Sequence, residues 1–189
     1  MSSDLHPWAE TLSALHDQVW TRLIRGVHDR RAAARHPTLA TVSADGTPQA
    51  RTIVLRAADR CAASLRFYTD RQSAKVAELR AQPKASLHIW DNSAHLQMRL
   101  LADVSFVMDE DVTAIWASLP EVARHSYGST PAPGQPLRDA LDYQKTPDPA
   151  AFIVGVLALQ EMDILHLGPQ HRRARFSRAD GWQGVWCAP

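Results

Sequence analysis

Hydrophobic residues in the first part of the chain recur with the period of an α-helix. From Pro7 to about residue 28 they stand three or four positions apart, which predicts one amphipathic helix. Pro7 suits the first turn of a helix, and Pro37 is expected to end an N-terminal helical segment over residues 1–36. The apolar stripe of this helix consists of Trp8, Leu12, Leu15, Val19, Leu23 and Val27.

After residue 37 the period becomes two, which is typical of β-strands. Strand-like runs cover residues 38–43, 48–56, 64–69, 85–91 and 95–107, and further runs follow from residue 150. Asp45-Gly46 predicts a hairpin between the first two runs. The sequence from 150 to 167 is expected to turn near Gln160-Glu161, and the last residues to form a hairpin around residues 179–181.

Two further helices are predicted, over 70–83 and 109–124. The expected total is eight or nine strands and two or three helices. Because the strands come in hairpin pairs, they should pair antiparallel. The pattern therefore favours a mainly β protein, a closed or half-open barrel with flanking helices, over a doubly wound sheet.

Composition narrows the function classes. The chain has 189 residues, which suits one domain, and a formal net charge of +1, which argues against a general nucleic-acid or membrane binder. The first ten residues lack the pattern of a secretory signal. Cys61 and Cys187 show no metal-site spacing and are expected to be unpaired, buried thiols in a reducing cytoplasm, although one long-range bridge is the alternative. The histidines show no metal-ligand spacing, so no metal is expected.

Three polar residues gather around the predicted start of the helix over 70–83. Thr69 and Ser73 offer hydroxyl groups, and Lys75 adds a positive charge where unpaired backbone amides already attract anions. Arg51, on a neighbouring strand, can add a two-pronged contact. The set predicts a phosphate site.

Arg51 and Arg56 bracket the run RTIVLR. On a regular strand, residues five apart point to opposite faces, so one phosphate should not engage both unless a bulge intervenes. The alternative is that both arginines only pair with Asp59 or Asp70. Equally, Ser73 can be a plain helix cap, and Lys75 can face solvent.

The ordered set of motifs supplies a resemblance. RTIVLR, FYTDRQSAKVAEL, ASLHIWD and LQMRL resemble the flavin-binding region of the pyridoxamine 5′-phosphate oxidase family, the FMN-binding split barrels. The resemblance is continuous over residues 37–107 and returns weakly in the C-terminal strands, 151–189. It implies a single antiparallel Greek-key split-barrel domain over 1–189, the cofactor FMN, and a homodimer with FMN at the subunit interface.

The resemblance also implies a role for each matching residue. The FMN phosphate would be held by Arg51, Thr69, Ser73 and Lys75. The backbone of Ile53 and Val54 would lie along the flavin, and Tyr68 and Gln97 would flank the ribityl chain or ring. Arg56 would take the place of a lysine that meets flavin or substrate, and Arg175 would reach the flavin from the second subunit. Candidate substrate contacts are Arg56, His171 and Arg173. No catalytic residue is singled out, because the flavin supplies the chemistry.

The substrate side departs from the family pattern. Trp116 and Pro120 stand where the family has a tyrosine and an arginine that hold the substrate phosphate, and Leu165 replaces a tryptophan that faces the flavin. The Arg-x-His pair near the C-terminus is reversed, as residues 171–173. We therefore expect a flavoprotein oxidoreductase whose substrate is neither pyridoxine nor pyridoxamine phosphate. The alternative is a non-catalytic carrier or sensor that binds flavin or haem.

Overall fold

The computed structural model describes residues 6–107 and 110–189. Within this part, nine strands form one antiparallel sheet, as predicted. They are β1 (Thr38–Val42), β2 (Pro48–Thr52), β3 (Leu55–Asp59), β4 (Ser64–Asp70), β5 (Lys84–Asp91), β6 (Leu96–Val107), β9 (Phe152–Leu167), β10 (His171–Ser177) and β11 (Val185–Cys187). A separate small hairpin joins β7 (Ser129–Thr130) to β8 (Gln144–Lys145).

Four α-helices flank the sheet. They are α1 (Leu12–His28), α2 (Ala74–Ala81), α3 (Glu110–Ser118) and α4 (Glu121–Arg124). Short 3₁₀ turns are η1 (Pro7–Glu10), η2 (Ala33–Arg35), η3 (Asn92–Ala94), η4 (Pro149–Ala151) and η5 (Arg178–Asp180). In the described residues, no helix is long and apolar enough to span a membrane.

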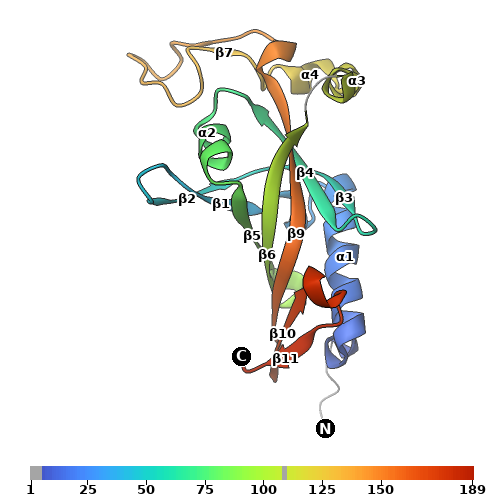
Figure 1. The fold of residues 1–189 in the computed structure, drawn as a ribbon. Helices are drawn as coiled ribbons and strands as arrows, with labels where there is room; N and C mark the ends of the chain where they lie inside the picture. Colours follow the sequence, from blue (N-terminus) through green and yellow to red (C-terminus); the bar gives the residue numbers. More distant parts are fainter. Residues whose placement is uncertain (1–5, 108–109) are drawn as a thin grey trace.

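The long strands β6 and β9 form the axis of the molecule (Figure 1). β6 pairs with β5 along one edge and with β9 along the other. The second edge of β9 is shared, since its first half pairs with β4 and its second half with β10. The α3 and α4 helices lie at one end of this axis, α2 lies beside the same half of it, and β10 and β11 lie at the other end.

The turn predicted near Gln160-Glu161 is wrong, because β9 runs on through these residues. In the pairing with β6, Leu101 faces Glu161 and Ala102 faces Leu159, so Gln160 is an extra residue in a β-bulge. A bulge leaves two successive side chains on one face. Gln160 and Glu161 therefore mark the point in β9 at which the alternation of buried and exposed side chains shifts by one residue.

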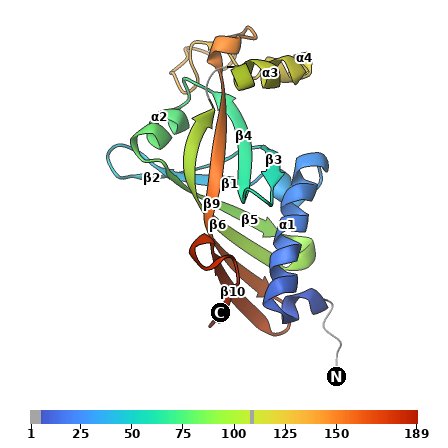
Figure 2. The ribbon, with the colours of Figure 1, turned by 45° about the vertical axis from the view of Figure 1, so that its right-hand side comes forward.

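The N-terminal helix breaks earlier than predicted. Thr11 separates η1 from α1 and caps α1, since its hydroxyl oxygen accepts a hydrogen bond from the Ala14 amide at 3.2 Å. The predicted apolar stripe is otherwise confirmed: Leu15, Val19 and Leu23 are buried in the main core between α1 and the sheet (Figure 2). Residues 1–5 of the predicted segment lie outside the described part.

A second, smaller core lies under α3. Tyr127, Phe152 and Val154 are buried there, with Trp116 of α3 packed on them. The helix predicted over 109–124 is divided into α3 and α4 at Pro120, which cannot continue a hydrogen-bonded helix. Asp109, its predicted first residue, lies outside the described residues.

The sheet face turned away from α1 is partly uncovered, and we call it the outer face. Leu101 on β6 and Trp90 on β5 are 46% and 41% exposed there. The thiols of Cys61 and Cys187 are both free, as predicted, but neither is buried. Cys61 is exposed in the turn between β3 and β4, and Cys187 on β11 is half-buried.

Candidate functional site

A cavity of about 320 Å³ opens where β3 and β4 meet the start of α2. The segment 126–133 closes one side of it. We call it the α2 cavity. Seven of the ten predicted cofactor residues line it, namely Ile53, Val54, Arg56, Tyr68, Thr69, Ser73 and Lys75.

One end of the α2 cavity is built to receive an anion. The Lys75 Nζ donates to the Thr69 hydroxyl at 3.0 Å, and that hydroxyl lies 3.3 Å from the Ser73 hydroxyl. Ser73 is the N-cap of α2, yet its side chain donates to the Asp70 carbonyl instead of capping the helix amides. Burial, and then the charge of Arg51, lower the pKa of Lys75. An anion in the cavity would oppose both effects, because a nearby negative charge favours the charged form of Lys75.

Asp70 lines the same cavity, but both oxygens of its carboxylate are engaged. One accepts the Gln72 amide at 2.8 Å, and the other accepts the Gly128 amide at 2.9 Å. Gly128 has a φ of +99°, and a Cβ there would meet the Thr146 carbonyl at 2.3 Å, so glycine is needed at this contact. Asp70 thus links the segment 126–133, which forms one wall of the cavity, to the end of β4.

Arg56 marks the other end of the α2 cavity. The single strand predicted over 48–56 is wrong: the chain leaves β2 after Thr52 and enters β3 at Leu55. The pairing of β3 with β4 then shifts between Leu55 and Ala57, which makes Arg56 a bulged residue. This irregularity overrides the strict alternation expected for the two arginines, and it lets Arg56 line the cavity.

The Arg56 guanidinium packs on aromatic groups. Its central carbon lies 5.6 Å from the centre of the Tyr68 ring. Burial raises the pKa of Tyr127, and the charge of Arg56 and a hydrogen bond from it oppose this effect. The Arg56 Nε is buried and has no hydrogen-bond partner within the described residues. A buried donor without a partner is costly, and a ligand acceptor in the cavity would satisfy it.

Arg51 does not line the α2 cavity. Its Nη2 lies 2.8 Å from the Glu78 carboxylate on α2, and its Nη1 donates to the Thr41 hydroxyl. The alternative partners considered from the sequence, Asp59 and Asp70, are therefore not the ones that the structure shows. Arg51 remains close enough to Lys75 to influence its ionisation.

Three other predicted residues lie on β6 and β10, toward the opposite end of the molecule (Figure 1). They are Gln97, His171 and Arg175, and they do not line the α2 cavity.

Arg173 also lies on β10, but its guanidinium is already engaged. It binds the Asp163 carboxylate through two hydrogen bonds of 2.9 and 2.7 Å. Arg99 contacts the same carboxylate. The hydrogen bonds from Arg173 and then Arg99 lower the pKa of Asp163. A substrate would have to compete with this ion-paired cluster for Arg173.

Five lining residues of the α2 cavity were not among the predicted site residues: Thr52, Asp70, Ser126, Tyr127 and Pro133. Tyr127 and Pro133 lie farthest from the motif in the chain. Both follow α4, about 55 residues or more after β4 in the chain, so no local pattern connects them to the phosphate motif. Gly128, directly after Tyr127, adopts a left-handed conformation, but nothing in the sequence links this pair to the cavity.

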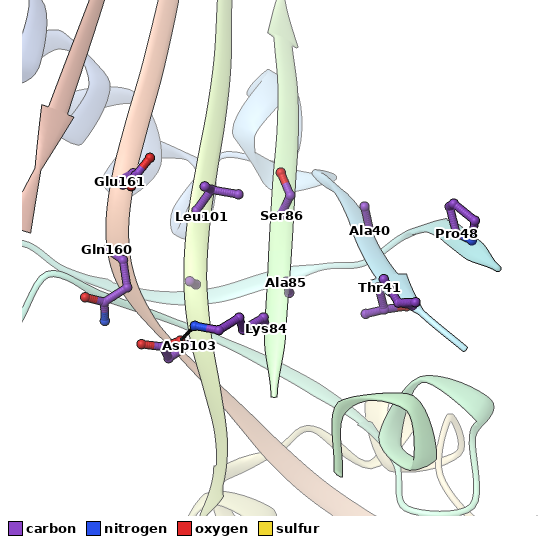
Figure 3. A pocket seen from close by; sticks show the side chains of 12 residues that line it. Ala40, Thr41, Pro48, Lys84, Ala85, Ser86, Leu101, Asp103, Gln160 and Glu161 are labelled. Carbon is purple, nitrogen blue, oxygen red and sulfur yellow. Dashed lines mark hydrogen bonds and ion pairs between the residues drawn. The ribbon is translucent and has the colours of Figure 1, made fainter. Parts of the chain in front are cut away.

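A shallow groove of about 380 Å³ runs across the outer face (Figure 3). Residues of β1, β5, β6 and β9 line it, with Leu101 and Ala40 among the apolar ones. At one end, Lys84 Nζ and the Asp103 carboxylate form an ion pair at 2.9 Å. The groove makes the outer face a candidate contact surface.

Comparison with known protein families identifies the family of this chain. The model of the family described as "Pyridoxamine 5'-phosphate oxidase, FMN-binding domain" matches residues 6–108. The chain belongs to this family. The resemblance stated from the motifs is thereby confirmed, and FMN is the cofactor of the matched domain.

Curated relatives carry the name pyridoxine/pyridoxamine 5′-phosphate oxidase. One from Azorhizobium caulinodans is 39% identical over 87 residues, which cover 46% of this chain and 40% of that protein. One from Caulobacter vibrioides is 42% identical over 89 residues, or 47% and 38% of the two chains. These matches thus span about two fifths of the relatives' length. One from Anaeromyxobacter dehalogenans is 27% identical over 172 residues, covering 82% and 83%.

Solved structures agree with the fold. A pyridoxamine 5′-phosphate oxidase-related, FMN-binding protein from Nostoc punctiforme has a TM-score of 0.74 at 28% identity, and the match covers both chains completely. PhzG from Burkholderia lata, solved with tetrahydrophenazine-1-carboxylic acid, has a TM-score of 0.73 at 19% identity, covering 99% and 98%. The latter shows the fold alone. The chain has the mostly antiparallel split-barrel architecture that was predicted.

The residues of the α2 cavity fit FMN. A phosphate needs several donors and a positive charge, which Lys75 and the neighbouring hydroxyls offer. A flavin ring needs a flat surface and a donor for its heteroatoms. Ile53, Val54 and Arg56 line the same cavity, and the buried Nε of Arg56 has no partner within the described residues.

Proposed function

We propose that this protein is an FMN-dependent oxidoreductase with an altered substrate site. The observation that carries the proposal is the α2 cavity, which joins a cationic, hydroxyl-lined end to an end with an unsatisfied guanidinium nitrogen. When bound, FMN supplies a hydride acceptor that passes electrons on. The chain supplies binding, orientation and exclusion of water.

Each end of the cavity has its own task. Lys75, Thr69 and Ser73 hold the phosphate, so the rest of the cofactor extends toward Arg56. The backbone of Ile53 and Val54 supports the ring, and Arg56 donates to the ring or to the substrate beside it. Arg51 joins the phosphate by exchanging Glu78 for it, because both anions lie near Lys75.

A second copy of the chain completes the site in this proposal. Gln97 and Arg175 are predicted flavin contacts, yet they lie on strands away from the α2 cavity of their own chain. If two outer faces meet in a homodimer with two-fold symmetry, each chain can present these residues to the other's cavity. The exposed Leu101 and the groove around it support an interface there.

In this proposal the substrate site differs from that of the vitamin B6 enzymes. Trp116 packs on Phe152 with ring centres 5.4 Å apart and so belongs to the smaller core. Arg124 lies four residues after Pro120, but its guanidinium donates to the carbonyls of Leu119 and Ala117. Arg173 is bound to Asp163. Arg56 is the remaining candidate cation, which favours an anionic substrate smaller than pyridoxine phosphate or held by fewer contacts.

The visible spectrum of the purified protein, reloaded with FMN, tests the cofactor. Flavin bands that stay with the protein through gel filtration are expected. A Soret band would instead identify a haem binder, and a colourless protein that FMN cannot reload would refute the proposal.

Reduction of the bound flavin tests the activity. We expect NADH or NADPH to reduce it without oxygen, and pyridoxine phosphate with oxygen to give no turnover above that of free FMN. Full turnover with pyridoxine phosphate would refute the altered substrate site. A bound flavin that no donor in such a panel reduces would support the carrier or sensor alternative.

A further inference from the structure

Arg35, the last residue of η2, bridges the end of α1 and the start of β3. These two elements lie side by side (Figure 2). The Arg35 Nη1 donates to the Val27 carbonyl at 2.7 Å and to the Leu55 carbonyl at 3.1 Å. The first contact satisfies a carbonyl in the last turn of the helix, where the helix itself offers no amide. The second contact reaches β3 at the residue directly before Arg56.

Leu55 is the point at which β3 departs from regular pairing. It pairs with Phe67 of β4, and the shift that follows leaves Arg56 as the bulged residue that lines the α2 cavity. The Leu55 side chain is fully buried in the main core. Core packing and the hydrogen bond from Arg35 therefore both fix the chain directly beside the bulge that directs Arg56.

A second hydrogen bond holds the same part of the cavity wall. The Ile53 amide donates to the Pro37 carbonyl at 3.0 Å, so the segment after η2 contacts the start of the wall as well as β3. Close packing fixes η2 in turn, because a Cβ on Gly26 of α1 would meet the backbone carbonyl carbon of Ala34 at 2.7 Å. The wall of the cavity is thus held from a segment that rests on the end of α1.

Arg35 and Arg56 also interact through their charges. Burial, and then the charge of Arg56, lower the pKa of Arg35. Both guanidinium groups remain ionised, since arginine keeps its charge in proteins. Their repulsion opposes any conformation that brings the two groups closer together, so it disfavours a return of Arg56 toward η2.

We propose that Arg35 is a positioning residue of the α2 cavity, which holds the bulge of β3 so that the Arg56 guanidinium faces the flavin or its substrate. The identity of this ligand rests on the proposed function, whereas the arrangement of the two arginines belongs to the chain without FMN. A residue that only capped α1 would stabilise the fold and leave Arg56 in place without it.

NMR of the protein labelled with isotopic tyrosine, without FMN, tests the arrangement. The central carbon of the Arg56 guanidinium lies 5.6 Å from the centre of the Tyr68 ring, whereas Tyr143 lies beside Lys145. We expect Arg35→Met to shift the Tyr68 resonances in the same direction as Arg56→Met does, and to leave those of Tyr143 unchanged. In the Arg56→Met protein, Arg35→Met should add no further shift at Tyr68, because the two residues act as one unit.

Arg30→Met is the matched control, since it removes the same charge from an exposed position before η2. It should leave Tyr68 unchanged, because exposed charges interact weakly through solvent. Arg35→Lys covers the case in which Arg35→Met does not fold. Lysine keeps the charge but loses the planar group that joins the two carbonyls, so a smaller shift in the same direction is expected. Unchanged Tyr68 resonances in a folded Arg35 variant, or an equal shift in the Arg30 control, would overturn the proposal.

The reduction potential of bound FMN extends the test to the flavin. A cation near the ring stabilises the reduced flavin, so Arg35→Met should make the potential more negative only while Arg56 is present. An equal change with and without Arg56 would overturn the positioning role and leave Arg35 as a cap of α1. A protein that binds no FMN would refute the proposed function, and the tyrosine resonances would still decide whether Arg35 positions Arg56.

Discussion

The α2 cavity and the outer face around β6, β9 and β10 hold the predicted flavin contacts in two different states. In the α2 cavity, Lys75, Thr69 and Ser73 already touch one another within one chain. On the outer face, Gln97 and Arg175 lie on separate strands, and Arg173 is bound to Asp163. The first region is a preformed pocket, whereas the second gains a role in flavin binding only if another copy meets it.

The two sets of predicted flavin contacts are thus positioned by different kinds of structure. Thr69, Ser73 and Lys75 lie within one short stretch of the chain, so a strand, a turn and the first residues of a helix arrange them locally. The outer-face residues depend on long-range pairing of β6, β9 and β10. The two regions should therefore respond differently to mutation, the pocket through affinity for FMN and the outer face through assembly.

The largest effect is expected in the pocket. Arg51→Ala combined with Lys75→Ala should lower the affinity for FMN by about 100-fold or more, because each charge-assisted contact contributes about 1.5–3 kcal/mol. Quenching of flavin fluorescence on titration measures this affinity. Arg30→Ala combined with Arg60→Ala is the control, since it removes the same charge from exposed positions. An unchanged affinity in the pocket variant would refute the phosphate assignment.

The next effect concerns assembly of the outer face. Leu101→Glu should weaken the proposed dimer by about tenfold or more, because it places a carboxylate beside Glu161 in an interface that excludes water. Sedimentation velocity measures the dimer fraction. Val122→Glu on α4, at a side chain that is 80% exposed, should leave it unchanged. A Leu101→Glu protein as dimeric as the parent would place the interface elsewhere.

Mixing two damaged proteins sharpens the comparison further. Arg51→Ala/Lys75→Ala damages one chain's pocket, and Arg175→Ala damages what the other chain is proposed to contribute. In an equimolar mixture of a two-fold dimer, half of the dimers combine both types, so about a quarter of all sites should be intact. Flavin retained after subunit exchange measures them. If the mixture binds no more flavin than the two proteins apart, Arg175 does not act across an interface.

The smallest effect is expected within the outer face itself. The hydrogen bonds from Arg173 lower the folded-state pKa of Asp163, so the stabilisation is present above the unfolded pKa of about 3.9 and is lost as the pH falls through the folded value. Asp163→Asn should therefore cost about 1 kcal/mol at pH 7 and less at pH 3. Urea denaturation at both values measures the difference.

Asp103→Asn supplies the control for this stability measurement. Asp103 pairs with Lys84 in an exposed ion pair, which is expected to contribute about 0–1 kcal/mol. A cost for Asp163→Asn that is equal at both pH values would show that the ionised carboxylate is not the source of the stability.

The sequence predicted the parts of the site that depend on neighbours in the chain. Thr69, Ser73 and Lys75 come together because a strand end, a cap and a first helical turn follow one another. The position of Arg56 was not predictable from alternation, because a bulge in β3 shifts the phase. The pairing of Arg51 with Glu78 joins residues 27 positions apart, and no periodicity reveals which of several carboxylates is nearest.

The fold was predicted in the same uneven way. Strand pairs joined by short turns were apparent from Asp45-Gly46 and the alternating runs, and their antiparallel pairing is confirmed. The continuity of β9 was not, because Gln160-Glu161 has the polarity of a turn. Only the partners on both edges of β9 hold such a pair inside one strand.

The bulge at Gln160 also determines how the chain tolerates changes of length. Before it, Leu157 and Leu159 point to the core, and after it Met162 and Ile164 do so, an odd number of positions later. Deleting Gln160 would restore regular alternation and send one of these two pairs to the opposite face of the sheet. Most surface loops absorb the loss of one residue, but here it would put the buried side chains of half of β9 on the wrong face of the sheet.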